Sequence, residues 1–218
     1  MKLIFATQNS HKIEEARGIL GESVEILVPA SLGLTEEVEE TGETLEENSL
    51  IKARFVKERL GGDCFADDSG LETEILSGAP GVYSARYGGA SHDFDANIKQ
   101  LLTNMAKRRT EAGMAASVGL KPVHATSKAR FRTVVTLILG EEIHTFEGEL
   151  RGVISLSRSG NGGFGYDPVF IPDEIPVGGK LVPNESRVTL AQLPAENKNA
   201  ISHRGKALRA MAEFLLGK

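Results

Sequence analysis

The sequence predicts a globular protein in which apolar strands and amphipathic helices alternate. Its 218 residues are 40% hydrophobic and 25% charged, which is ordinary globular usage. This length is enough to bury a core in one domain or in two small lobes. The start of the chain already shows the alternation, because an apolar run at 3–6 and a polar turn precede a helical pattern.

The amino-terminal segment joins a buried strand to a helix whose start carries polar residues. Residues 3–6 form the strand, and apolar residues at 13, 16, 19 and 20 give residues 13–20 a helical face. Asn9 or Ser10 can cap this helix, and the amides of a helix start can hold an anion. Lys12 lies in the first turn, where a cation is unfavourable against the helix dipole. A bound anionic ligand would compensate this charge, although a solvated surface lysine is the plainer alternative.

An acidic loop at residues 31–42 precedes the next helix, and four glutamates fall within five of its positions. Such a run is usually a solvated face, but it can also supply a metal ligand. Thr44 and Glu47 form a capping-box pattern, which starts a helix that reaches about Leu60. Lys52 on this helix can reach a phosphate or pair with a neighbouring glutamate.

The segment Asp67-Asp68-Ser69-Gly70 follows the apolar run 64–66 and is the centre of the predicted site. We expect a strand that ends in these residues and places the carboxylates at a sheet edge, where they can hold Mg²⁺. Adjacent side chains on a strand point to opposite faces, so one aspartate faces the site and the other supports it. An ordinary Asp-Ser-Gly turn is the alternative interpretation.

The rest of the chain alternates glycine-rich loops with further strands and helices. We expect a short strand at 24–28, a glycine-proline loop at 78–89, an amphipathic helix at 93–109, a hairpin of strands at 130–139 and 142–149, strands at 152–157 and 169–171, a second glycine loop with two aromatics at 159–168, a loop-rich stretch at 177–187, and a final helix opened by residues 198–206. Residues 110–128 are small, polar and unpatterned, which indicates a flexible insertion. No domain boundary is evident, although the hairpin region can form a lobe of its own.

Charge and cysteine content narrow the partners and the compartment. The net charge of −5 leaves no basic surplus, so we expect no nucleic acid or membrane partner and only small phosphorylated ligands. The single cysteine, Cys64, cannot form an internal disulfide and is expected to be a buried hydrophobe, which fits a reducing, cytoplasmic location. We find neither a signal peptide nor an apolar run of about 18 residues, so a transmembrane helix is not expected.

Three groups of hydrogen-bond donors accompany the acidic centre, at 7–12, at Lys52, and at Lys198 with the pair His203-Arg204. In an acidic protein this predicts a site for a small polyanion with a flat ring, such as a nucleoside triphosphate with Mg²⁺. A carboxylate would then accept the proton of a metal-oriented water. Walker and dinucleotide glycine fingerprints are absent, which argues against an ATP-driven motor or a Rossmann dehydrogenase. A metal role for His203 is disfavoured because no second histidine stands at ligand spacing.

Seven blocks of sequence follow one another in an order that indicates one family. They are Thr7–Lys12, Glu39–Gly42, Glu47–Arg54, Ala66–Leu71, Gly78–Tyr87, Gly162–Pro168 and Ile201–Gly205. Together these blocks closely resemble the inosine/xanthosine triphosphate pyrophosphatase family, the dITP/XTP pyrophosphatases, over nearly the whole chain.

The resemblance implies an α/β fold with a long central mixed sheet and two lobes around a nucleotide-binding cleft, usually in a homodimer. It also implies hydrolysis of noncanonical purine nucleoside triphosphates (ITP, dITP and XTP) to the monophosphate and pyrophosphate with Mg²⁺, which removes them from the nucleotide pool. A non-catalytic nucleotide-binding regulator and a pyrophosphatase for other modified nucleotides remain alternatives.

The resemblance also implies roles for individual residues. Asp68 would be the proton acceptor and a metal ligand, and Glu39, in preference to Glu40, would help to hold the metal. The substrate would be bound by Thr7, Gln8, Asn9, Ser10, His11, Lys12, Lys52, Ser69, Phe164, Gly165, Tyr166, Asp167, Lys198, His203 and Arg204. Gln8 departs from the family pattern, which more often has glycine there.

Overall fold

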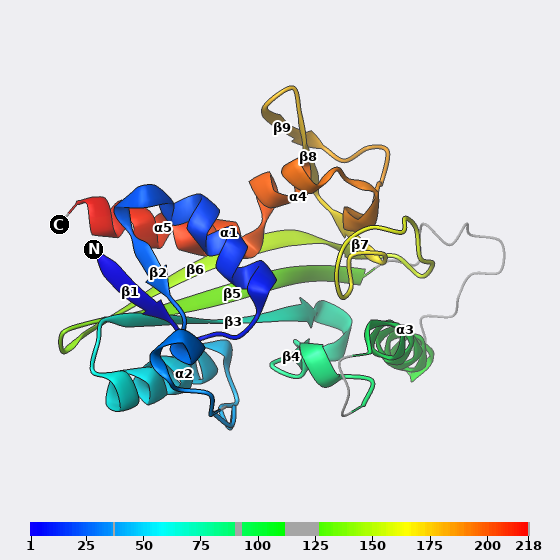
Figure 1. The fold of residues 1–218 in the computed structure, drawn as a ribbon. Coiled ribbons are helices and arrows are strands. Elements are labelled where there is room, and N and C mark those ends of the chain that lie inside the picture. The colour runs from blue at the N-terminus through cyan, green and yellow to red at the C-terminus, as the bar shows by residue number, and fades with distance from the viewer. Residues whose placement is uncertain (37, 90–92, 112–126, 218) are drawn as a thin grey trace. The chain divides into compact units, whose positions relative to one another are not determined.

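The computed structural model describes residues 1–36, 38–89, 93–111 and 127–217 and contains both helices and strands (Figure 1). The helices are α1 (Ser10–Leu20), α2 (Leu45–Leu60), α3 (Phe94–Glu111), α4 (Ala195–Ile201) and α5 (His203–Leu216). The strands are β1 (Lys2–Phe5), β2 (Glu25–Leu27), β3 (Cys64–Thr73), β4 (Pro80–Gly81), β5 (Ser127–Leu139), β6 (Glu142–Ile154), β7 (Phe170–Pro172), β8 (Glu174–Val177) and β9 (Lys180–Pro183). Within these described residues, no helix is long and apolar enough to cross a membrane.

The strands form one seven-stranded mixed sheet and one separate hairpin. The order in the large sheet is β2-β1-β3-β5-β6-β7, and β4 pairs with β3 beside this path. β1 runs parallel to both β2 and β3, whereas the pairs β3–β4 and β6–β7 are antiparallel. β8 and β9 form a separate two-stranded sheet and, among the residues that the structure describes, pair only with each other. The expected α/β class with a mixed central sheet is confirmed.

The chain divides into two compact units. Unit 1 comprises Met1–Ser69, Thr133–Glu149 and His203–Lys218, and unit 2 comprises Gly70–Arg132 and Leu150–Ser202. β3 therefore belongs to unit 1 up to Ser69 and to unit 2 from Gly70. The hairpin of β5 and β6 contributes to both units, so it is not a lobe of its own.

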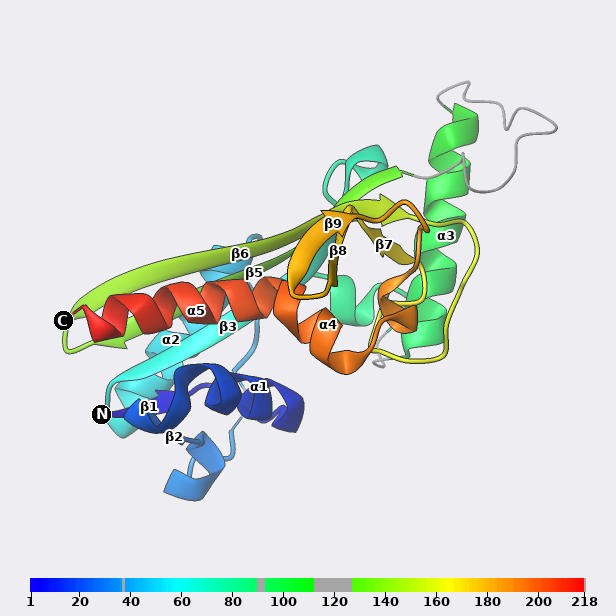
Figure 2. The same cartoon turned by 90° about the horizontal axis from the view of Figure 1, so that it is seen from above.

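In unit 1, alternating side chains of β1 and β3 build a core on each face of the sheet. Phe5 and Phe65 are fully buried in a cluster with residues of α1 and α5, and their rings stack with centroids 4.2 Å apart. Ile4 and Cys64 point the other way, into a cluster with residues of α2. Figure 1 accordingly shows α1 and α5 on one side of these strands and α2 on the other, and Figure 2 shows α5 running along the β5–β6 hairpin.

In unit 2, α3 supplies the main apolar face. Ile98, Leu101 and Met105 lie in one buried cluster with Leu71 of β3 and Phe170 of β7. This confirms the amphipathic helix expected from the spacing of its apolar residues. This core holds β3, β7 and α3 together, and Tyr166 of the second glycine-rich loop packs into it.

The two helix starts predicted from local sequence are confirmed. Asn9 caps α1, because its Oδ1 accepts the amides of His11 and Lys12. The hydroxyl of Thr44 accepts the amide of Glu47, and the Glu47 carboxylate accepts the amide of Thr44, which completes the capping box of α2. Both signals lie within four residues of sequence, so they could be read without knowing the fold.

The expected end of a strand at Asp67–Gly70 is wrong, and so is the alternative of a turn there. β3 continues to Thr73 and carries these residues in its interior. It does so because β4 pairs with it, with Leu71 opposite Gly81. Gly70 allows this pairing, since a Cβ at that position would lie 2.4 Å from the carbonyl oxygen of Gly81.

Three further expectations in the second half are corrected. The separate strand expected at 152–157 is the end of β6, and the loop expected at 177–187 contains β9 and the turn of its hairpin. Gly178 and Gly179 have φ of 58° and 79° in that turn, a conformation that favours glycine. The final helix begins at His203, because the extended backbone of Ser202 separates α4 from α5. Of the expected insertion at 110–128, residues 112–126 lie outside the described residues.

Candidate functional site

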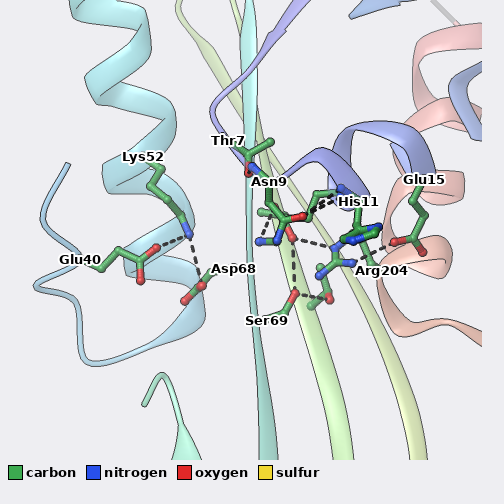
Figure 3. A network of polar contacts seen from close by, with 12 residues as sticks. Thr7, Asn9, His11, Glu15, Glu40, Lys52, Asp68, Ser69 and Arg204 are labelled. Atoms are coloured by element: carbon green, nitrogen blue, oxygen red, sulfur yellow. Dashed lines mark hydrogen bonds and ion pairs between the residues drawn. The ribbon is translucent and has the colours of Figure 1, made fainter. Parts of the chain in front are cut away.

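The two neighbouring aspartates of β3 lie in separate groups of charged side chains in unit 1. Figure 3 shows Asp68 beside Lys52 and Glu40 in one group, and Arg204 with Glu15 in the other. Asp67 contacts Lys12 and Arg204, whereas Asp68 contacts Lys52. This separation follows from strand geometry, because consecutive side chains point to opposite faces. The interior position of both residues in β3 fixes their backbone.

Asp67 is a buried acceptor for two cations from two helices. Nζ of Lys12, in the first turn of α1, lies 3.0 Å from Oδ1, and Nε of Arg204, in the first turn of α5, lies 2.9 Å from Oδ2. Arg204 also donates from Nη1 to Glu15 at 2.9 Å, and the Ser69 hydroxyl donates to Asp67 at 3.4 Å. The carboxylate therefore ties the starts of α1 and α5 to β3.

The charges around Asp67 determine its protonation. Burial raises the pKa of this carboxyl, but the cations of Lys12 and Arg204 outweigh burial and hold its pKa far below the usual range. Asp67 therefore stays ionised and is a poor proton acceptor. Burial also lowers the pKa of Lys12, and the positive charges of Arg204 and Lys52 lower it further. The negative charge of Asp67 raises it but does not outweigh them. A phosphate close to these cations would favour their charged forms.

Asp68 shares one cation with a residue of the acidic loop. Nζ of Lys52, on α2, lies 3.2 Å from Oδ1 of Asp68 and 2.6 Å from Oε1 of Glu40. The side chains of Lys52 and Asp68 are each 11% exposed, and that of Glu40 is 29% exposed. Oδ2 of Asp68 is buried and has no hydrogen-bond partner among the described residues.

Asp68 is electrostatically the opposite of Asp67. Burial raises the pKa of its carboxyl, and the negative charges of Glu40 and Asp67 add to that rise, while Lys52 and Lys12 only partly offset it. For Lys52, burial works against the ammonium, but the carboxylates of Asp68, Asp67 and Glu40 outweigh it and raise its pKa. A carboxylate whose pKa is shifted toward neutrality is the better general base.

The donors around Asp68 fit a hard divalent cation. The described part of the chain contains no group of three histidine, cysteine or acidic side chains placed to hold a metal. Mg²⁺, however, is commonly bound by one or two carboxylates together with waters and substrate phosphates. Asp68 and Glu40 already share one cation, and Oδ2 of Asp68 lacks a partner among the described residues. Glu39 is exposed, so this contact favours Glu40 over Glu39 as the second ligand.

The loop before α1 presents polar side chains near Lys12. Thr7 accepts the amide of Asn9 at its hydroxyl, 3.2 Å away, and Asn9 in turn occupies two amides of the helix start. Gln8 donates to the carbonyl of Thr35 at 3.5 Å. Ser10 and His11 are exposed. An anion at this helix start would therefore contact side chains as well as amides.

His203 and Ser69 lie in the same unit as the aspartates. Burial of His203 lowers its pKa to about 3, with Arg204 and Lys12 adding to the effect against Asp67. The ring is therefore neutral at physiological pH and can act as a hydrogen-bonding group rather than as a cation. The Ser69 hydroxyl lies 2.7 Å from that of Thr133 on β5, which fixes its orientation.

The other predicted substrate contacts form a second group within unit 2. Asp167 is buried, and its Oδ2 accepts Nζ of Lys198 at 2.9 Å and the amide of Phe164 at 2.8 Å. Gly165 has φ of 62°, which favours glycine there. Tyr166 is buried, and its hydroxyl donates to the carbonyl of Ser84 at 2.9 Å, so this side chain anchors the loop. Phe164, in contrast, is 57% exposed.

Two contributors to the unit 1 network were missed in the sequence. Glu15 holds Arg204, and it stands three residues after Lys12 on α1, a spacing that places both on one helix face. That spacing could have identified it. Thr133 is a fully buried residue inside a strand, and nothing in its local sequence marks it as the partner of Ser69.

Comparison with known proteins places these residues in a family. The sequence matches the Ham1 family over residues 3–214. The dITP/XTP pyrophosphatase of Porphyromonas gingivalis is 44% identical over 215 residues, which are 99% of this chain and 97% of that protein. The dITP/XTP pyrophosphatase of Bacillus subtilis is 40% identical over 216 residues, covering 97% of this chain and 96% of that protein.

Solved structures agree with the sequence matches. A HAM1 protein from Coxiella burnetii superposes with a TM-score of 0.82 at 30% identity and covers 100% of both chains. The nucleoside-triphosphatase / dITP/XTP pyrophosphatase from Mycobacterium abscessus gives a TM-score of 0.71 at 36% identity, covering 97% of this chain and 98% of that one. Because the match extends over nearly every residue from β1 to α5, the chain belongs to the Ham1 family.

Proposed function

We propose that this protein hydrolyses noncanonical purine nucleoside triphosphates, such as dITP, ITP and XTP, to the monophosphate and pyrophosphate. The observation that carries the proposal is Asp68, a buried carboxylate with a raised pKa and one oxygen without a partner among the described residues. Relatives at 44% and 40% identity are named dITP/XTP pyrophosphatases. The reaction would remove these nucleotides from the pool.

Asp68 is proposed to accept the proton of the attacking water. Its raised pKa suits a general base, and positioned bases of this kind contribute about 10²–10⁴ in rate. The α,β-anhydride bond then breaks and pyrophosphate leaves. Lys52, 3.2 Å from Asp68, lies where a cation can stabilise negative charge on the phosphates.

Mg²⁺ is the proposed cofactor, and Asp68 and Glu40 are the residues that would hold it. Bound there, the ion would neutralise phosphate charge and orient the attacking water. Glu39 is the less favoured ligand because it is exposed, whereas Glu40 lies 2.6 Å from the ammonium of Lys52.

Substrate binding is assigned to the two groups of polar residues already described. In unit 1 we assign the phosphates and sugar to residues 7–12 and Lys52, and further nucleotide contacts to Ser69, His203 and Arg204. In unit 2 we assign the nucleotide to residues 164–167 and Lys198. The 6-keto group of the base would be selected by hydrogen bonds that an adenine amino group leaves unpaired.

The proposed setting is a cytoplasmic homodimer that acts on free nucleotides. The net charge of −5 supports small-molecule substrates over nucleic acid or membrane partners. The dimer and the compartment rest on the family resemblance. Sedimentation at several protein concentrations would measure the oligomeric state.

A substrate panel tests the proposal. ITP, XTP, dITP, GTP, ATP, dUTP and dTTP are incubated with the protein and Mg²⁺, and pyrophosphate and orthophosphate are measured separately. Rapid release of pyrophosphate from the first three, with little orthophosphate, is expected. Equal rates on all seven would contradict selection of the 6-keto purine, and tight binding of ITP without turnover would indicate a regulator instead of an enzyme.

A further inference from the structure

Phe164 lies in a segment without regular secondary structure. Residues 159–168 contain neither helix nor strand, and glycines stand on both sides of Phe164. Its side chain is 57% exposed. A largely exposed aromatic side chain can turn between rotamers unless another group packs against it.

The first residue of α3 supplies that packing. The rings of Phe94 and Phe164 have centroids 4.5 Å apart and planes at 63°, which is the edge-to-face geometry that aromatic pairs favour. Both residues belong to unit 2. Phe94 is half-buried, and the contact leaves more than half of the Phe164 side chain open to solvent.

A second contact joins the same helix turn to the same loop. Nη1 of Arg158 lies 2.6 Å from Oδ1 of Asp95, the residue after Phe94. Solvent screens this exposed pair, so it adds little energy by itself, but it is a second link between this segment and α3. Asp93 makes the turn rigid, because its Oδ1 accepts the amides of Asp95 and Ala96 at 2.9 and 3.1 Å.

The helix turn and the loop together line an open pocket. Its volume is about 440 Å³, and its lining includes Phe94, Arg158 and Phe164. The Asp167 carboxylate accepts the amide of Phe164 and also accepts Nζ of Lys198. Asp167 therefore holds the backbone of Phe164, and Phe94 holds its ring.

We propose that Phe94 is a positioning residue for nucleotide binding, which holds the ring of Phe164 so that its open face can stack on the base. The inference rests on the proposed function, because Phe164 is assigned to nucleotide binding there. A ring that is already oriented loses less conformational entropy when a flat base binds. As a positioning residue, Phe94 acts on the nucleotide through Phe164, so its removal should raise KM and leave kcat in place.

The kinetic test compares three variants on ITP. Phe94→Ala is expected to raise KM about two- to tenfold, the size expected for one aromatic pair, with kcat within about twofold of wild type. Phe94→Tyr keeps the ring and should restore the wild-type KM. Phe214→Ala is the matched control, because it removes another half-buried ring, 5.5 Å from that of Phe146 in unit 1, and should leave KM unchanged.

A second measurement does not depend on turnover. Hydrogen exchange of the amides at 159–165 is followed in the ligand-free protein, where Phe94→Ala should speed exchange and Phe94→Tyr should not. If the wild type releases no pyrophosphate from ITP while exchange changes as expected, the proposed function fails and the positioning of Phe164 stands. Unchanged exchange in Phe94→Ala, or a wild-type KM for ITP in an active enzyme, would overturn the positioning role.

Discussion

At the scale of single residues, the surroundings of Asp67 and Asp68 give two identical side chains different chemistry. Asp67 faces two cations, which hold its pKa low and make it a fixed structural charge. Asp68 shares one cation with Glu40, and burial raises its pKa. The candidate base and its neighbour are thus separated by the two faces of one strand.

Asp68→Asn should abolish pyrophosphate release while the fold survives. Asparagine keeps the volume of the side chain but cannot accept a proton, so kcat on ITP is expected to fall by at least about 10²-fold. Asp63→Asn is the control, because the Asp63 carboxylate pairs with Lys57 at 3.5 Å and accepts the amide of Gly140 at 2.8 Å, and this variant should keep wild-type kcat. Near-wild-type turnover in Asp68→Asn, at an unchanged melting temperature, would refute its role as base.

His203 should make stability depend on pH. In the folded protein the pKa of His203 is lowered to about 3, whereas that of an unfolded histidine is about 6.5. The unfolded state therefore binds more protons between these values, so the stabilisation is complete above about pH 6.5 and is lost as pH falls toward 3. Between pH 6.5 and 5, the wild type should lose ~1–2 kcal/mol more unfolding free energy than His203→Gln, measured by urea denaturation. Equal losses would rule out the buried neutral histidine.

At the scale of elements, local signals predicted the helices well. Asn9 at the start of α1 and the pair Thr44 and Glu47 at the start of α2 act through contacts within four residues. Sequence could therefore specify them without the fold. Cys64 is also buried, as its place in an apolar run predicts, and burial raises the pKa of its thiol to about 11.

Pairing with distant segments explains what the sequence did not predict. β3 extends through Gly70 because β4 pairs with it, and that partner lies ten residues away along the chain. The site has the same origin, since Asp67 meets Lys12 from 55 positions before it and Arg204 from 137 positions after it. Local patterns supplied the residue types, and the resemblance supplied their roles, but only the fold showed that Glu40 rather than Glu39 pairs with Lys52.

Gly42→Ala should weaken Mg²⁺ binding, because it should shift the acidic loop that carries Glu40. The amide of Gly42 donates to Asn48 at 2.8 Å, and a Cβ there would lie 2.6 Å from Cβ of Glu47. The loop that carries Glu40 would have to shift, so the Mg²⁺ concentration for half-maximal rate should rise about tenfold.

Gly18→Ala is the matched control for that prediction. Gly18 lies within α1, and a Cβ there meets nothing within 4 Å. Alanine should add ~0.5–1 kcal/mol of stability and leave the Mg²⁺ dependence unchanged. The same Mg²⁺ dependence in Gly42→Ala as in Gly18→Ala would show that the acidic loop does not hold the ion.

At the scale of the whole molecule, unit 1 is assembled from three separate stretches of the chain. Met1–Ser69 and Thr133–Glu149 supply its strands, and His203–Lys218 returns to complete it. α5 brings Arg204 to Asp67 and places Leu208 and Met211 in the core formed with β1 and β3. The last helix therefore serves the core and the site together.

A chain that ends at Ser202 should lose the fold of unit 1 as well as activity. Leu208 and Met211 are fully buried, and truncating a buried side chain of this size to alanine costs ~2–5 kcal/mol. Removing both, together with the ion pair of Arg204, approaches the ~5–15 kcal/mol that stabilises a typical domain. Circular dichroism should then show no cooperative melting of a unit 1 core, whereas a chain ending at Leu216 should melt like the wild type. If the shorter chain melts cooperatively at the wild-type temperature, α5 is not needed to fold unit 1, and its contribution reduces to holding Arg204 against Asp67.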